Sequence, residues 1–145
     1  MQSNSRIETE EEIDDYIAKM KYALDHGASI NFQRKRKVDE GREYKYTNEY
    51  TVGNLFPNEN PSSALKRELK TLTVREYIET VKDINFPNRS EMRVFGKTYQ
   101  GTEDIYIKIR VEIFDEAAAG NHTVFVMSFH YAAKPFKHTT FPYRN

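Results

Sequence analysis

The sequence has 145 residues, of which 30% are charged and 38% hydrophobic, and its formal net charge is zero. This length suits a single domain over residues 1–145 with a hydrophobic core, and its 10 Tyr and 9 Phe argue against disorder. Because there is no cysteine, disulfides and thiolate metal sites are excluded, and a cytoplasmic location is favoured. No apolar run has the length of a membrane helix, so we expect no membrane partner.

The first predicted element is a helix over residues 10–25. Thr9 and Glu12 have the spacing of a capping box, and apolar residues follow at helical intervals. The acidic residues of the first turn suit the helix dipole, which gives them a structural explanation. Outside residues 1–15 the chain carries 21 basic and 16 acidic residues. This surplus favours nucleic acid only slightly.

Residues 28–60 permit two interpretations. The basic run 34–37 is followed by Tyr44, Tyr46 and Tyr50. Such a mixture can stack on bases and neutralise phosphates, or it can form the solvated face of a hairpin or helix. The Asn and Pro residues of 54–61 then predict a loop.

Two further helices are predicted, one over 61–72 and a second over 73–81, with Thr73 and Glu76 as its capping box. A loop over 82–91 leads to three predicted strands, at 92–99, 105–114 and 123–131, joined by turns at 100–104 and 115–121. Helices followed by a meander predict an α+β fold, with helix 10–25 packed on one face of an antiparallel sheet.

Alternation within the last two strands predicts their register. The odd-numbered isoleucines of 105–114 line one face, and in 123–131 we assign Phe125, Met127, Phe129 and Tyr131 to the same core face. Matching these faces pairs His130 with either Tyr106 or Lys108. One polar face then holds five side chains: Tyr106, Lys108, Arg110, Ser128 and His130.

This polar face also has two interpretations. Antiparallel sheets commonly expose one face to water, and that alone explains its charges. Alternatively, the face suits phosphodiester chemistry: Lys108 and Arg110 would stabilise phosphorane charge, and His130 would move protons near neutral pH. A ribose 2′-hydroxyl attacking its own phosphate needs no metal or cofactor. The four histidines are scattered without metal-ligand spacing, so no metal site is predicted.

The C-terminal tail alternates aromatic and basic residues. We expect its aromatics to lie along the sheet edge and cover it. Its bases, among them Lys134 and Arg144, would then border the substrate face.

Residues 65–145 resemble the MqsR family of type II toxin–antitoxin toxins. The resemblance is carried by "LKTLTVREYIE", "MRVFGKTYQGTEDIYIKIRVEI", "VFVMSFHYAAKPF" and "FPYR", in this order and spacing. It implies a RelE-like α+β fold, cleavage of mRNA without a cofactor, and neutralisation by a cognate antitoxin.

The resemblance also assigns residues. Tyr106 matches the family's "YIKI" tyrosine, while His130 stands where lysine follows "SF" and is interpreted as a proton-transfer substitute. Gly96 stands where the family has glutamine, and Lys97 beside it would supply the polar group. The candidate catalytic residues are His130, Tyr106, Lys108 and Lys97. The candidate substrate-binding residues are Arg110, Arg93, Lys134 and Arg144.

The alternative function is a module that binds RNA or protein without cleaving it. The same polar face and basic segment would serve such a module. A protein of a phage or mobile element that engages a host protein belongs to this second class.

Overall fold

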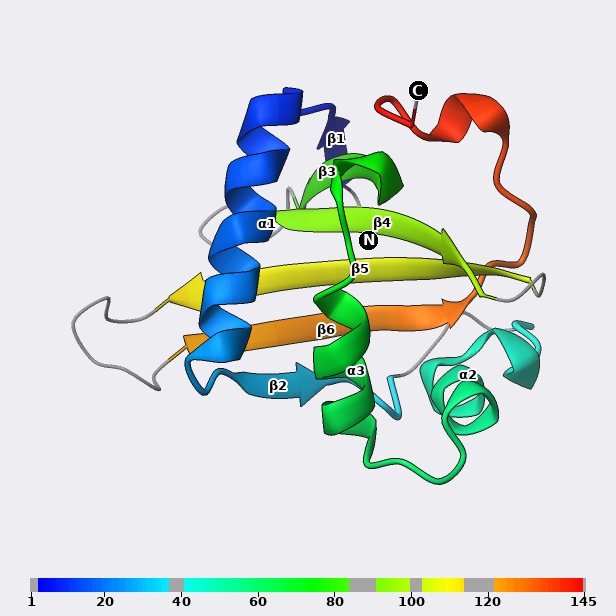
Figure 1. Ribbon diagram of the computed structural model, residues 1–145. Helices are drawn as coiled ribbons and strands as arrows, with labels where there is room; N and C mark the ends of the chain where they lie inside the picture. The colour runs from blue at the N-terminus through cyan, green and yellow to red at the C-terminus, as the bar shows by residue number, and fades with distance from the viewer. Residues whose placement is uncertain (1–2, 37–40, 84–90, 100–102, 114–121, 145) are drawn as a thin grey trace.

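The computed structural model describes residues 3–36, 41–83, 91–99, 103–113 and 122–144. Within these residues the protein is α+β, with three α-helices and one six-stranded mixed sheet (Figure 1). The helices are α1 (Glu10–Asp25), α2 (Asn48–Leu55) and α3 (Pro61–Leu69). The strands are β1 (Ser3–Arg6), β2 (Ser29–Phe32), β3 (Tyr77–Asp83), β4 (Met92–Thr98), β5 (Asp104–Ile113) and β6 (His122–Tyr131). Three short 3-10 turns, η1 (Tyr44–Tyr46), η2 (Val74–Glu76) and η3 (His138–Thr140), complete the described elements.

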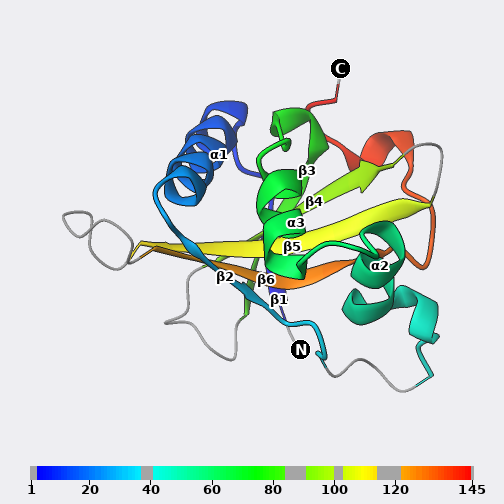
Figure 2. The same cartoon turned by 60° about the horizontal axis from the view of Figure 1, so that its bottom comes forward.

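The sheet has the order β1-β3-β4-β5-β6-β2. All described neighbours are antiparallel except β2, which runs parallel to β6. Helices α1 and α3 stand on one face, as Figure 2 shows with the sheet closer to edge-on. We call this the helical face and the opposite one the tail face.

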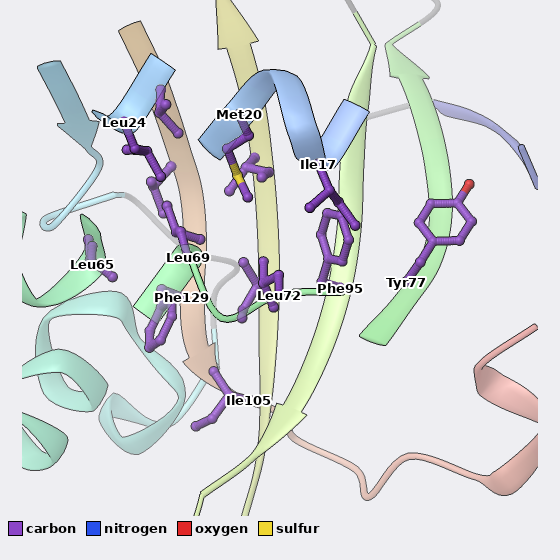
Figure 3. Close-up of a cluster of buried hydrophobic side chains, with 14 of the residues drawn as sticks. Ile17, Met20, Leu24, Leu65, Leu69, Leu72, Tyr77, Phe95, Ile105 and Phe129 are labelled. Atoms are coloured by element: carbon purple, nitrogen blue, oxygen red, sulfur yellow. The ribbon is translucent and has the colours of Figure 1, made fainter. Parts of the chain in front are cut away.

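The main core lies between these helices and the sheet (Figure 3). Ile17, Met20 and Leu24 point from α1 toward the strands, where Phe95 and Phe129 receive them. All five side chains are almost wholly buried. Burying a side chain of this size is worth about 1.5–3 kcal/mol, so this layer is the main source of stability.

Several predicted elements are confirmed. Helix α1 begins after Thr9, whose side chain accepts a hydrogen bond from the Glu12 backbone N–H at 3.1 Å, as the capping box requires. Helix α3 and strands β4, β5 and β6 also lie where the sequence predicts them. Most of the loop at 82–91 and the turns at 100–104 and 115–121 fall outside the described residues.

The predicted helix over 73–81 is wrong. The capping box of Thr73 and Glu76 is present, but it closes only the turn η2, and the chain continues as strand β3. The reason is composition: Ile78, Thr80 and Val81 are β-branched, and they pair well in an extended strand between β1 and β4. A capping box starts a helix but does not extend it.

The predicted order of helices first and strands afterwards is also corrected. Strand β1 precedes α1, and β2 lies between α1 and α2. The described residues of the range 28–60 therefore belong to the sheet and its border. Asn48 and Thr51 at the start of α2 continue the pairing of β6 beyond β2. The Asn48 side chain accepts from Phe129 N at 2.9 Å and donates to the Met127 carbonyl, and Thr51 Oγ1 accepts from Tyr131 N at 2.9 Å.

The β5–β6 register is confirmed at the end that contains His130 and corrected beyond it. Tyr106 pairs with His130 and Lys108 with Ser128, but the next pair is Ile109 with Val126, which leaves Met127 as a bulge. This extra residue exchanges the faces of the first half of β6. Val124 and Val126 therefore join the helical-face core, whereas Phe125 and Met127 pack on the tail face, contrary to the prediction.

The C-terminal tail crosses the tail face of the sheet instead of following its edge. Phe136 and Phe141 pack with a second cluster formed by Ile78, Val81, Met92 and Val94. The Phe136 backbone N–H donates to Asp104 Oδ2 at 2.7 Å, which anchors the tail to the start of β5. At the far end Tyr143 stacks on Tyr77 and donates its hydroxyl hydrogen to the Glu8 carbonyl oxygen at 2.5 Å. The tail is thus fastened at both ends.

Gly96 makes the close approach of the tail possible. A Cβ atom at this position would lie 2.6 Å from Cε2 of Phe136 and 3.0 Å from Cδ1 of Ile78. We expect Gly96→Ala to lower the free energy of unfolding by about 1–3 kcal/mol, as is typical of overpacking. Urea denaturation measures this change.

Gly53 in α2 supplies the matched control, because its added Cβ would meet nothing within 4 Å. Gly53→Ala should stabilise the protein by about 0.5–1 kcal/mol through helix propensity. Equal effects of the two substitutions would contradict the role assigned to Gly96.

Candidate functional site

A cavity of about 370 Å³ opens on the tail face, next to the paired ends of β5 and β6. We call it the His130 pocket. Its walls come from β5, β6, the start of the tail, and the two ends of the segment between β2 and η1. The lining residues are Arg36, Arg42, Tyr106, Lys108, Ser128, His130, Ala132, Ala133, Lys134 and Phe136. Four of these described residues are Arg or Lys and none is Asp or Glu, so the pocket suits an anionic ligand.

His130 is half-buried at the base of this pocket. Its Nδ1 lies 2.9 Å from the Tyr131 carbonyl oxygen. Because a carbonyl oxygen only accepts, Nδ1 carries the hydrogen and Nε2 of the neutral ring is left as a proton acceptor. Burial lowers the pKa of His130, the charges of Arg42 and Arg36 lower it further, and the bond to Tyr131 opposes them. His130 is therefore neutral near pH 7, as a general base must be.

Tyr106 stacks on His130 from the neighbouring strand. The ring centroids are 5.5 Å apart and the planes are inclined by 22°. Burial, reinforced by the negative charge of Glu79, raises the pKa of Tyr106. Its hydroxyl stays protonated near neutral pH and is available as a hydrogen-bond donor.

Lys108 and Ser128 form the next pair along the same two strands. Their exposed fractions are 8% and 2%, although both lie on the tail face. The tail face is therefore less exposed to solvent than the sequence suggests, because the tail covers part of it. A positive charge in such a mostly buried position interacts more strongly with an anion than one at the surface does.

The structure brings together four of the eight candidate residues: His130, Tyr106, Lys108 and Lys134. Arg110 is outside the pocket. Its Nε donates to Glu112 at 2.6 Å, and its guanidinium lies 4.7 Å from the centre of the Phe125 ring.

Three other candidates have different positions. Lys97 contacts Thr71 and lies 5.0 Å from the centre of the Tyr99 ring, so it belongs to the helical-face side. Arg93 forms an ion pair with Glu8 on that same side. Arg144 lies over the Phe141 ring at 3.7 Å, far along the tail from the pocket lining. The alternation of β4 explains two of these cases, because Gly96 faces the tail and its neighbour Lys97 cannot.

Sequence reasoning missed Arg36 and Arg42 as pocket residues. The basic run 34–37 is a signal for Arg36, but it leaves open which of its members faces the pocket, and it does not include Arg42. The parallel pairing of β2 with β6 brings Arg36 to the pocket. Lys37 lies outside the described residues.

No family model, no curated protein and no solved structure matches this chain. Across the described ranges, no three His, Asp or Glu side chains come together as a metal-binding group. In the part of the chain that the structure describes, no helix has both the length and the apolar character needed to cross a bilayer. The function is therefore argued from the pocket.

The lowered pKa of His130 predicts a pH-dependent contribution to stability. The folded protein binds this proton less readily than the unfolded chain, so the contribution is present above the unfolded pKa of about 6.5 and is lost as the pH falls toward the folded pKa. We expect the difference in unfolding free energy between the wild type and His130→Gln to shift against the wild type between pH 7 and pH 5. Urea denaturation across this range measures it, and a constant difference would contradict the assigned environment.

Proposed function

We propose that the protein is an endoribonuclease that cleaves mRNA without a metal or cofactor and acts as the toxin of a type II toxin–antitoxin system. The observation that carries the proposal is the His130 pocket, where a neutral histidine with an accepting Nε2 lies among four cationic side chains. The resemblance of residues 65–145 to the MqsR family supports the same conclusion. The α+β architecture, with helices on one face of the sheet and the pocket on the other, is compatible with a RelE-like fold.

The pocket residues account for the chemistry of transesterification. His130 Nε2 takes the proton of a ribose 2′-hydroxyl, whose oxygen forms a bond to the adjacent phosphorus. Lys108 and Lys134 stabilise the charge of the phosphorane. The bond from phosphorus to the 5′ oxygen then breaks, and this oxygen takes a proton from a cationic donor of the pocket. The products are a 2′,3′-cyclic phosphate and a 5′-hydroxyl end.

The pocket also indicates an unpaired substrate. Its volume is at the lower end of the 300–1,000 Å³ typical of ligand sites, which leaves room for about one nucleotide. Tyr106, His130 and Phe136 supply rings on which an unstacked base can lie. The partners of this protein would then be single-stranded mRNA and a cognate antitoxin that blocks the pocket.

The test is incubation of the purified protein with mRNA in EDTA, followed by gel electrophoresis and analysis of the ends. We expect discrete fragments with cyclic phosphate ends, and no fragments from the same strand made with 2′-deoxyribose. Restoration of activity only by a divalent ion would contradict the proposed chemistry. Shifted but intact RNA would instead support the non-catalytic binding module.

A further inference from the structure

We propose that Arg36 and Arg42 bind a phosphate group of the RNA strand in the His130 pocket, on the side opposite the tail. Neither residue belongs to the part of the chain that resembles the MqsR family. The inference deepens the proposed function and rests on it only in taking the anionic ligand to be RNA.

The sheet topology places these two arginines at the pocket. Strand β2 pairs in parallel with β6, from Ser29 with Thr123 to Phe32 with Val126. The chain therefore leaves β2 in the direction in which β6 runs toward His130. The backbone bond from Gln33 N to the Val126 carbonyl and the bond from the Asn48 amide to the Gln33 carbonyl continue this attachment. The Arg36 backbone N–H in turn donates to the Gln33 carbonyl, so Arg36 is held beside β6, and Arg42, two residues before η1, lines the same pocket.

The charges of the pocket then lie on two sides. Lys134 belongs to the tail, which Asp104 anchors, while Arg36 and Arg42 come from the segment beside β2. Lys108 lines the pocket from β5. A guanidinium donates in a planar fork that matches two phosphate oxygens, whereas an ammonium acts as a point charge. The arginines therefore suit the task of orienting the phosphate, and the lysines that of stabilising it.

The electrostatics of His130 support this placement independently of any ligand. Burial lowers its pKa, and the positive charges of Arg42 and Arg36 lower it further. Among the described residues, the charged groups that line the pocket or act electrostatically on the Tyr106–His130 pair are these two arginines, Lys108, Lys134 and Glu79. Removing the arginines should therefore raise the His130 pKa.

The experiment compares Arg36→Gln, Arg42→Gln and the double variant with Arg34→Gln. Arg34 is in the same segment, is exposed, and lies 3.9 Å from Glu49, outside the pocket lining. The probe is a fluorescent 2′-O-methyl RNA 12-mer, which cannot be cleaved by its own 2′ oxygen. We expect each pocket variant to bind about tenfold more weakly in anisotropy titrations, as befits one charge-assisted hydrogen bond. The salt dependence should fall by about 0.7 per arginine. Arg34→Gln should bind like the wild type.

A second measurement needs no RNA. NMR titration of the His130 ring should show a higher pKa in the double variant and an unchanged one in Arg34→Gln. The His130→Gln spectrum identifies the resonance.

The outcomes separate this inference from the proposed function. Unchanged binding in the arginine variants, with weaker binding in Lys108→Gln, would overturn the inference and leave the ribonuclease intact. Arginine-dependent binding by a wild type that cleaves no RNA would overturn the ribonuclease and uphold the phosphate site. An unchanged His130 pKa in the double variant would also overturn the inference.

Discussion

His130→Ala should reduce RNA cleavage by about 10²–10⁴-fold, the usual contribution of a general acid or base. The structure gives the physical reason. Nδ1 donates to the Tyr131 carbonyl oxygen, so Nε2 is the accepting nitrogen of the neutral ring, and His130 lines the pocket. Alanine removes this acceptor and leaves the cations in place. Single-turnover cleavage of a labelled mRNA in EDTA measures the loss, and binding of the 2′-O-methyl strand should change far less than the rate.

The control for this substitution is His138→Ala. His138 lies in the exposed turn η3 of the tail and is not among the pocket residues. Its loss should leave cleavage unchanged. His130→Ala also removes the stack on Tyr106, so the folded fraction is to be checked by circular dichroism and set equal before rates are compared. A folded His130→Ala protein that cleaves at the wild-type rate would place the base elsewhere.

Part of the site is predictable from the sequence, because it depends only on the alternation of side chains within the β5–β6 hairpin. Tyr106, Lys108, Ser128 and His130 meet because two adjacent strands pair through matching faces, and this register was available from the sequence. The bulge at Met127 was not available, because the pattern of 123–131 fits uninterrupted alternation equally well. The error left the His130 end intact, since the shift begins beyond Ser128.

The rest of the site depended on long-range pairing, which a single sequence does not display. Strand β2 has only four residues, and its parallel partner β6 begins some 90 positions later, so neither its existence nor its position followed from local signals. Arg36 and Arg42 were therefore not assigned to the pocket. Arg93 and Lys97 lie away from the pocket for a simpler reason: β4 alternates, and the tail packs on Gly96, which is on the opposite face from both. Strand β3 is not predicted because the capping box at Thr73 suggests a helix over 73–81, and β1 has only four residues.

Arg93, which the sequence suggests as a substrate-binding residue, instead belongs to a buried hydrogen-bond network at the junction of β1 and α1. Glu8 is 4% exposed. Its carboxylate accepts from Arg93 at 2.8 and 2.9 Å and from Thr80 at 2.5 Å. Burial alone would raise the pKa of Glu8, but the hydrogen bonds from Arg93 and Thr80 outweigh it, and the pKa is lowered. The Glu8 carbonyl oxygen also accepts a hydrogen bond from the Tyr143 hydroxyl, and the Glu8 N–H donates to the Tyr77 hydroxyl. The network therefore attaches the tail to the sheet.

Glu8→Gln should accordingly cost about 3 kcal/mol of unfolding free energy, the lower end of the range for breaking a buried ion pair. Most of this cost arises because the Arg93 guanidinium stays partly buried without its counter-charge. Urea denaturation at pH 7 measures it. The matched control is Glu91→Gln, which breaks the pair of Glu91 with Arg6, whose side chain is 48% exposed, and should cost no more than about 1 kcal/mol.

The pH dependence of this difference tests its electrostatic origin. Because the folded pKa of Glu8 is lowered, its stabilisation is complete above the unfolded value of about 4.3 and is lost as the pH falls through the folded pKa. The wild type and Glu8→Gln should therefore converge in stability below about pH 4. A stability difference that persists in acid would show that Glu8 acts through packing. Equal costs for Glu8→Gln and Glu91→Gln would contradict the role of the buried network in holding the tail.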